Sequence, residues 1–102
     1  MRVLVFFDLP VKTKDERRKA TQFRNALLKD GFYMIQFSLY ARICNTLESA
    51  KSHEERISKS VPKSGSVRSL IVTEKQYASM NILVGEIKKK DKKIDAQQLC
   101  FL

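Results

Sequence analysis

The alternation of apolar and polar residues predicts a first β-strand at the amino end of the chain. Residues 3–7 are all large or β-branched, and Leu9-Pro10 ends the run by removing a backbone donor. Because side chains alternate along a strand, one face carries Val3, Val5 and Phe7, and the other carries Leu4 and Phe6. A strand that is apolar on both faces must be covered on both faces. Asp8 stands where this strand is expected to end, at the rim of a dry sheet.

Two later segments have the spacing of amphipathic helices. Thr13 and Glu16 form a capping-box pattern before a predicted helix over about residues 14–29, which Asp30-Gly31 should end. Its apolar face consists of Ala20, Phe23, Ala26 and Leu27. A second helix is expected to begin after Asn45 or Thr46 and to end near Ser60. Its apolar stripe consists of Leu47, Ala50, Ile57 and Val61.

The remaining apolar segments predict further strands. The segment 32–43 is either one long strand or a hairpin, and its alternation defines two faces. We expect the wholly apolar face against the helices: Tyr33, Ile35, Phe37, Leu39, Ala41 and Ile43. The other face is mixed, as at an interface: Phe32, Met34, Gln36, Ser38, Tyr40 and Arg42. Residues 66–73 and 80–84 are also predicted strands, with one helical turn from Thr73 to Tyr77 between them.

These elements predict an α+β domain that needs a second copy. Two helices can cover only one face of a four-stranded sheet, so the face of Leu4 and Phe6, or that of Val3, Val5 and Phe7, stays open. We expect a two-fold homodimer packed sheet against sheet, burying about 800 Å² per partner. Residues 1–87 form the expected domain. Residues 88–102 comprise a lysine-rich linker and an apolar terminal strand, 97–102, which is expected to pair with the edge of a partner chain, either the second copy or, if the chain has one, another protein that it assembles with.

The charge balance changes this picture by indicating a polyanionic partner. Twenty Lys and Arg against eleven Asp and Glu give a net charge of +9 and a pI near 9.8. The alternative is a merely soluble basic surface, but the cations cluster in residues 12–29 and 88–93. No apolar run approaches the ~20 residues of a membrane span. Cys44 and Cys100 form no CxxC pair, which favours a reducing cytoplasm.

Candidate chemistry is confined to Asp8. Across a dimer axis, Asp8 and its symmetry mate could share a hydrated Mg²⁺, the minimum for metal-assisted phosphodiester hydrolysis. The alternative is that Asp8 hydrogen-bonds a turn or pairs with an arginine. The single histidine, His53, lacks a second histidine at metal spacing and is expected to be a solvated surface residue. There is no glycine-rich phosphate loop, and residues 67–73 lack the aromatics of an RNA-recognition motif.

Several motifs together resemble one family over nearly the whole chain. They are MRVLVFFDLP at 1–10, ERR at 16–18, FR at 23–24, GFYMIQFSLY at 31–40 and VRSL at 67–70. This combination resembles the small subunit of the CRISPR adaptation machinery, the second CRISPR-associated protein family. The resemblance implies a ferredoxin-like βαββαβ homodimer with an extra terminal strand. It also implies that the dimer bridges two integrase dimers and holds double-stranded prespacer DNA.

The resemblance also suggests roles for individual residues. Members of this family have been described as metal-dependent nucleases acting on RNA or DNA, with the strand-one Asp as metal ligand, and Asp8 occupies that position. Arg17 and Arg18 match the family's basic residues, and Phe37-Ser38 its second-strand motif. The expected function is therefore a CRISPR adaptation scaffold that binds duplex phosphates through Lys12, Lys14, Arg17, Arg18, Arg24, Arg42 and Arg68. The first alternative is a Mg²⁺-dependent endonuclease centred on Asp8. The second is a regulatory dimer that binds a protein or small molecule.

Overall fold

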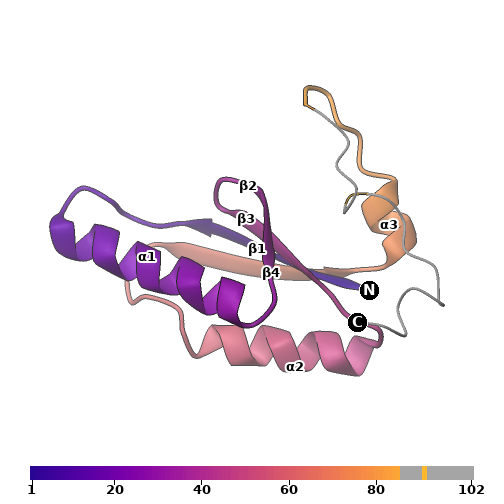
Figure 1. Ribbon diagram of the computed structural model, residues 1–102, viewed down its shortest axis with the longest axis horizontal. Coiled ribbons are helices and arrows are strands. Elements are labelled where there is room, and N and C mark those ends of the chain that lie inside the picture. The colour runs from indigo at the N-terminus through magenta and orange to yellow at the C-terminus, as the bar shows by residue number, and fades with distance from the viewer. Residues whose placement is uncertain (86–90, 92–102) are drawn as a thin grey trace.

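The computed structural model describes residues 1–85 and 91, which fold into a sheet with helices on both sides (Figure 1). In chain order the elements are β1 (Arg2–Asp8), α1 (Lys14–Lys29), β2 (Tyr33–Gln36), β3 (Leu39–Ile43), α2 (Leu47–Ser58), β4 (Ser66–Val72) and α3 (Glu74–Ala78). The four strands are antiparallel in the order β2-β3-β1-β4. This is the βαββαβ topology of a ferredoxin-like fold, so the predicted α+β class is confirmed.

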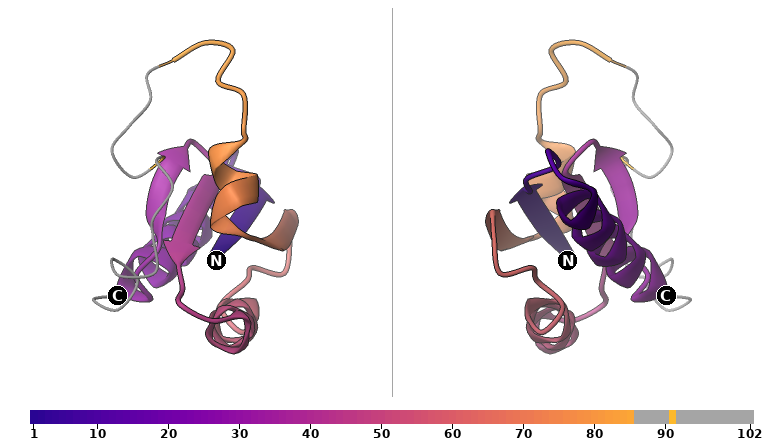
Figure 2. Two further views of the ribbon diagram at one scale, coloured as in Figure 1. Left: turned by 90° about the vertical axis from the view of Figure 1, so that its right-hand side faces the viewer. Right: turned by 90° about the vertical axis from the view of Figure 1, so that its left-hand side faces the viewer.

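The main core lies between the sheet and the two long helices. Figure 2 shows α1 and α2 on one side of the sheet and α3 on the other. The buried cluster on the α1/α2 side joins the central strand to both helices through Val3, Val5, Phe7, Phe23, Leu27, Ala50 and Ile57. The rings of Phe7 and Phe23 meet edge to face, with centroids 5.3 Å apart. Of the two alternatives for β1, the face of Leu4 and Phe6 is therefore the one that points away from α1 and α2.

Local sequence signals set the bounds of both long helices. The Thr13 Oγ1 accepts a hydrogen bond from the Glu16 amide at 3.1 Å, and a Glu16 carboxylate oxygen accepts one from the Thr13 amide at 2.9 Å. This capping box starts α1 at the predicted residue, and Gly31, at φ 93°, follows its end. Helix α2 begins after Thr46 and ends at Ser58, close to the predicted Ser60. Of its predicted apolar stripe, only Ala50 and Ile57 are buried.

The segment 32–43 is a hairpin, and the layer that we predicted for its apolar face is wrong. Its strands turn at Phe37-Ser38, where Ser38 has a φ of 67°. The apolar residues Tyr33, Ile35, Leu39 and Ala41 do share one face, but they pack with Leu4 and Tyr77, on the α3 side of the sheet. Phe32 and Tyr40, from the mixed face, pack with the long helices instead. Alternation determines which residues share a face, not which layer covers that face.

The strand predicted over residues 80–84 is also wrong. These residues follow α3 without strand pairing, and Leu83 and Val84 are 92% and 96% exposed. The helical turn predicted from Thr73 to Tyr77 is confirmed as α3. The five lysines of the segment 88–93, Cys100 and the expected terminal strand 97–102 lie outside the described residues. In the part of the chain that is described, no helix combines the length and apolar character needed to cross a membrane.

Candidate acid site and nucleic-acid interface

The side of the sheet opposite α1 and α2 is only partly covered. We call it the open face; toward the Asp8 end it carries Phe6, Asp8, Leu39 and Arg68, and Leu70 lies on it opposite Leu4. Leu4 and Ala41, nearer α3, are buried with Tyr77. Farther along β1, Phe6 is 39% exposed, and Leu70, opposite Leu4 on the edge strand β4, is 52% exposed. The apolar surface that the described chain leaves uncovered on this face therefore lies around Phe6 and on the edge strand β4.

A buried ion pair fixes α3 on this face. The side chain of Arg2 is fully buried, and its Nε donates to both carboxylate oxygens of Glu74, at 3.0 and 2.9 Å. Its guanidinium also donates to the Tyr33 hydroxyl and lies 4.0 Å from the centroid of the Tyr77 ring. Burial by itself lowers the pKa of Arg2, but the hydrogen bond to Glu74 and the nearby charges raise it overall.

The Tyr77 hydroxyl links α3 to a residue farther along the chain. Its hydroxyl donates to the Asp91 carboxylate at 2.7 Å. Burial of the Tyr77 hydroxyl raises its pKa, and the hydrogen bond to Asp91 raises it further. The group therefore remains a protonated donor throughout the physiological range. This bond ties Asp91 back to α3, whereas the buried ion pair between Arg2 and Glu74 is what joins α3 to the sheet.

Asp8 lies at the other end of β1, with its side chain in solvent. It pairs with Ser66 across the ladder and is exposed. Gly65, at φ 97°, lets β4 approach closely here, because a Cβ on it would stand 2.7 Å from the Asp8 carbonyl oxygen. Within residues 1–85 and 91, the Asp8 carboxylate makes no hydrogen bond or ion pair. Among the described residues, therefore, Asp8 does not form the ion pair with an arginine that was the alternative prediction.

A metal ion fits Asp8 only as half of a site. No group of three or more His, Cys, Asp or Glu residues converges among the described residues. Mg²⁺ retains several waters and takes one or two carboxylates, so one exposed carboxylate is compatible with a hydrated ion but does not enclose it. A second carboxylate would have to come from a second copy of the chain.

The basic residues predicted to hold phosphates are mostly on α1. Lys12, Lys14, Arg17 and Arg18 are exposed around its amino end. Arg17 donates to the carbonyls of Val11 and Lys12, at 3.1 and 3.0 Å, which fixes the loop before the helix. Arg18 pairs with Asp15, which lowers the pKa of that carboxyl. A shallow groove of about 640 Å³ runs along this surface beside Lys14, Asp15, Arg17, Arg18, Thr21 and Gln22.

The other three predicted cations differ in their surroundings. Arg24 is half-buried on α1. Arg42 is also half-buried, and its guanidinium donates to the carbonyls of Asp30 and Ile43, at 2.7 and 2.8 Å. Arg68 is exposed on β4, opposite Phe6. The structure therefore brings the α1 cations together and places Arg68 apart, on the other side of the sheet.

His53 belongs to a cluster that the sequence did not reveal. Its Nδ1 lies 2.7 Å from an Asp30 carboxylate oxygen, and its side chain is only 13% exposed, so the prediction of a solvated residue is wrong. Arg56 donates to the other Asp30 oxygen at 2.6 Å. Burial of Asp30 alone raises its pKa, but the hydrogen bonds from His53 and Arg56 lower it overall. The cluster joins the end of α1 to α2, which no local spacing could indicate.

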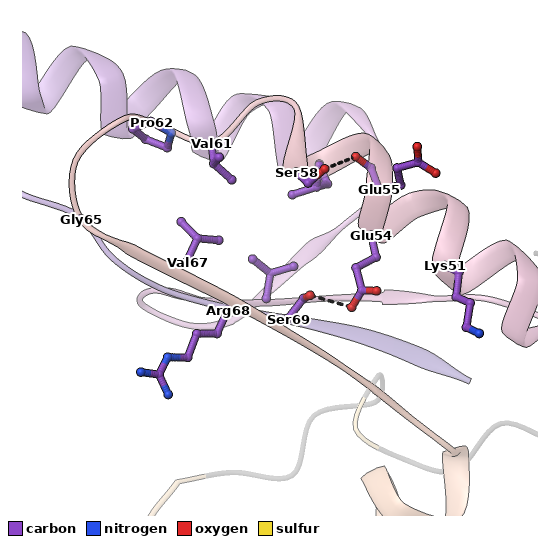
Figure 3. Close-up of a pocket in the computed structure, with 12 residues that line it drawn as sticks. Lys51, Glu54, Glu55, Ser58, Val61, Pro62, Gly65, Val67, Arg68 and Ser69 are labelled. Carbon is purple, nitrogen blue, oxygen red and sulfur yellow. Dashed lines mark hydrogen bonds between the residues drawn. The ribbon is translucent and has the colours of Figure 1, made fainter.

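A groove of about 550 Å³ between α2 and the edge strand β4 was also not predicted (Figure 3). Val61, Pro62 and Val67 form part of its apolar lining. On its rim, the Glu54 carboxylate accepts a hydrogen bond from the Ser69 hydroxyl at 2.6 Å. The side chain of Arg68 points away from α2, toward the opposite side of the sheet.

Comparison with known proteins decides the family. Residues 1–80 match the family model described as CRISPR associated protein Cas2. The chain belongs to the Cas2 family. Among its Cas2 relatives, proteins from Acidovorax ebreus and Ligilactobacillus salivarius are both named CRISPR-associated endoribonuclease Cas2. The first is 54% identical over 99% of each chain, and the second is 44% identical over 100% of each.

A solved Cas2 structure has the same fold. The crystal structure of Streptococcus pyogenes Cas2 at pH 6.5 superimposes with a TM-score of 0.62 at 19% identity, covering 82% of this chain and 100% of that one. At this identity the match concerns the fold alone. It agrees with the ferredoxin-like topology described above.

Proposed function

We propose that this chain is a Mg²⁺-dependent endonuclease that works as a two-fold homodimer, with the two Asp8 side chains forming one acid site. The observation that carries the proposal is the exposed Asp8 carboxylate at the rim of the incompletely covered open face. The names of the Cas2 relatives favour RNA as a substrate, and the charge of +9 suits any polyanion.

Exposed apolar residues support the dimer. Phe6 and Leu70 lie on the open face, and Leu83 and Val84 project beyond α3, all of them substantially exposed. Exposed apolar patches of this kind are typical of protein interfaces. We propose that two open faces pack together, sheet against sheet. We also propose that the terminal segment 97–102 adds to the partner's edge strand, because β4 is an edge of the sheet.

In this dimer, Asp8 from each chain would hold the ion. A bound Mg²⁺ supplies charge stabilisation to a phosphodiester and activates water. The chain's own contribution is to fix two carboxylates at the ends of two rigid strands, near a surface that attracts polyanions. The close approach of Gly65 to the Asp8 carbonyl oxygen fixes the backbone of Asp8, from which each carboxylate side chain extends.

The test is cleavage of RNA and duplex DNA by the wild type and by Asp8→Asn, with Glu48→Gln as a matched exposed control. We expect cleavage by the wild type and the control, and a loss of at least about a hundredfold in Asp8→Asn. Equal rates in Asp8→Asn would remove this carboxylate from the reaction. A wild type that remains monomeric at micromolar concentration, without exposed apolar surface, would contradict the dimer.

The second candidate function is the prespacer scaffold of CRISPR adaptation in the cytoplasm. It is favoured by the exposed cations at the amino end of α1. Among the residues that the structure describes, the side chains of Lys12 and Lys14 make no hydrogen bond or ion pair. It predicts sequence-independent duplex binding, with a salt slope of roughly −0.9 per neutralised phosphate. Weak, salt-insensitive binding would contradict it and favour a regulatory dimer for a protein or small molecule.

The scaffold also predicts an integrase partner. We propose that residues 97–102 contribute to that contact, because apolar edge strands recruit partner chains. Deleting these residues should abolish co-purification with the integrase of the same locus, while duplex binding through α1 persists. Undiminished co-purification of the truncated chain would place the integrase contact elsewhere.

A further inference from the structure

The predicted phosphate-binding residues are divided between two surfaces of the sheet. The cations of α1 lie on the helix layer, which packs on Val3, Val5 and Phe7. Arg68 lies opposite Phe6, on the open face. A phosphate held by α1 and a phosphate held by Arg68 are therefore on opposite sides of the β-sheet, and one short segment of nucleic acid cannot contact both within a single chain.

The position of Arg68 relates it to Asp8 instead. In the β1–β4 ladder, Ser66 is opposite Asp8 and Arg68 is opposite Phe6, so Asp8 and Arg68 are diagonal neighbours on one face. Such neighbours are about 7–8 Å apart, within the reach of an arginine side chain. Figure 3 shows that the Arg68 side chain leans toward the Gly65 end of β4, which is the end beside Asp8.

Both side chains are available to a ligand. Asp8 and Arg68 are exposed, and neither side chain forms a hydrogen bond or ion pair within the described ranges 1–85 and 91. By contrast, the guanidinium of Arg42 donates hydrogen bonds to the carbonyls of Asp30 and Ile43. The guanidinium of Arg68 keeps all of its N–H donors in one plane, a geometry that can bind two oxygens of one phosphate.

We propose that Arg68 holds the phosphodiester that reacts at Asp8, and that it is a substrate-contacting residue of the acid site, not part of the duplex-binding surface of α1. This inference rests on the proposed endonuclease function. The guanidinium of Arg68 and the carboxylate of Asp8 lie diagonally across two paired strands. In this arrangement Arg68 would bind the phosphate oxygens next to Asp8. The α1 cations are thereby assigned to retention of the nucleic acid and Arg68 to the reacting phosphate.

The experiment compares Arg68→Ala and Arg68→Lys with Lys59→Ala, an exposed cation at the end of α2 on the helix layer. Cleavage of RNA is measured as kcat and KM at constant ionic strength. Binding of a short fluorescein-labelled RNA is measured by anisotropy in EDTA, and the oligomeric state by light scattering. We expect Arg68→Ala to lower kcat/KM by about tenfold to a hundredfold, as for a charged hydrogen bond, and to weaken the binding of short RNA.

The variants separate the proposal from its alternatives. Arg68→Lys should recover only part of the loss, because it keeps the charge without the fork, and Lys59→Ala should behave as the wild type. Long-duplex affinity and its salt slope should stay within about twofold in Arg68→Ala. If Asp8-dependent cleavage is intact in Arg68→Ala, the assignment of Arg68 is overturned while the endonuclease stands.

Two further results would overturn the assignment in other ways. If Arg68→Ala is monomeric and regains its activity at higher protein concentration, Arg68 is a subunit contact. If the wild type shows no cleavage that Asp8→Asn abolishes, the endonuclease itself fails and Arg68 has no reacting phosphate to hold. A dimeric Arg68→Ala with normal duplex binding and impaired cleavage is the result that supports the proposal.

Discussion

The buried ion pair between Arg2 and Glu74 provides a quantitative test of how α3 is held on the sheet. Arg2 is fully buried, and Glu74 is 7% exposed. Replacing Glu74 by Ala removes the carboxylate that accepts three of the guanidinium's hydrogen bonds, at 2.9 to 3.0 Å. The remaining arginine must either stay charged in an apolar setting or pull α3 away to reach water.

The expected cost follows from that choice. Removing one partner of a buried ion pair typically destabilises a protein by about 3–5 kcal/mol, because an uncompensated charge is left behind. The free energy of unfolding of a small domain is only about 5–15 kcal/mol, so Glu74→Ala should remove a large share of it. At ~4–8 °C per kcal/mol for a domain of this size, Tm should fall by more than about 12 °C.

The assay is urea unfolding, with Glu55→Ala as a control because Glu55 is exposed on α2. Glu55→Ala should change the free energy of unfolding by less than about 0.5 kcal/mol. The double variant Arg2→Leu/Glu74→Leu should be less destabilised than Glu74→Ala, because neither charge is left unpaired. The reasoning is refuted if Glu74→Ala stays within about 1 kcal/mol of the wild type at an unchanged m-value.

Three further predictions concern other parts of the fold. Gly65→Ala should lower stability by about 1–3 kcal/mol, because φ is 97° and the new Cβ would meet the Asp8 carbonyl; a raised Tm would contradict this. The pKa of Asp30 is lowered in the folded state, so its contribution is present above its unfolded pKa and lost as pH falls through the folded one. Urea titrations from pH 6 to about 3 should therefore show a smaller acid-induced loss for Asp30→Ala than for the wild type, and parallel curves would exclude the ion-pair cluster as the cause. Phe23→Ala should cost about 3–5 kcal/mol, because this ring is 1% exposed; an unchanged urea midpoint would show that the α1 core contributes little.

Part of the candidate site could be predicted, because it depends only on residues that are close together in the sequence. The sequence placed Asp8 at the end of the first strand because an apolar run followed by Leu9-Pro10 marks that end wherever the strand lies. It also identified the basic amino end of α1, because those cations are close together in the chain. It could not show that Arg68 lies on a different surface from the cations of α1, because the side of the sheet on which Arg68 lies depends on the register between β4 and β1.

The errors occurred where a property depends on contacts between distant segments. The predicted strand 80–84 has the composition of a strand, but no described segment pairs with it. His53 was expected in solvent because no second histidine stands at metal spacing from it, but its Nδ1 lies 2.7 Å from a carboxylate oxygen of Asp30, at the end of another helix. The wholly apolar face of the hairpin was expected beneath α1 and α2, but it faces α3 and the open side.

By itself, then, the sequence determined the starts of the helices, the extent of α1, the first strand and the place of Asp8 at the end of that strand. Each of these follows from residues within a few positions of one another, through capping, alternation and backbone restriction. Only the tertiary structure decided which face each helix covers, where Arg68 lies relative to Asp8, and how Arg2 and His53 are held. These depend on strand order and register, because pairing brings together side chains that are far apart in the chain.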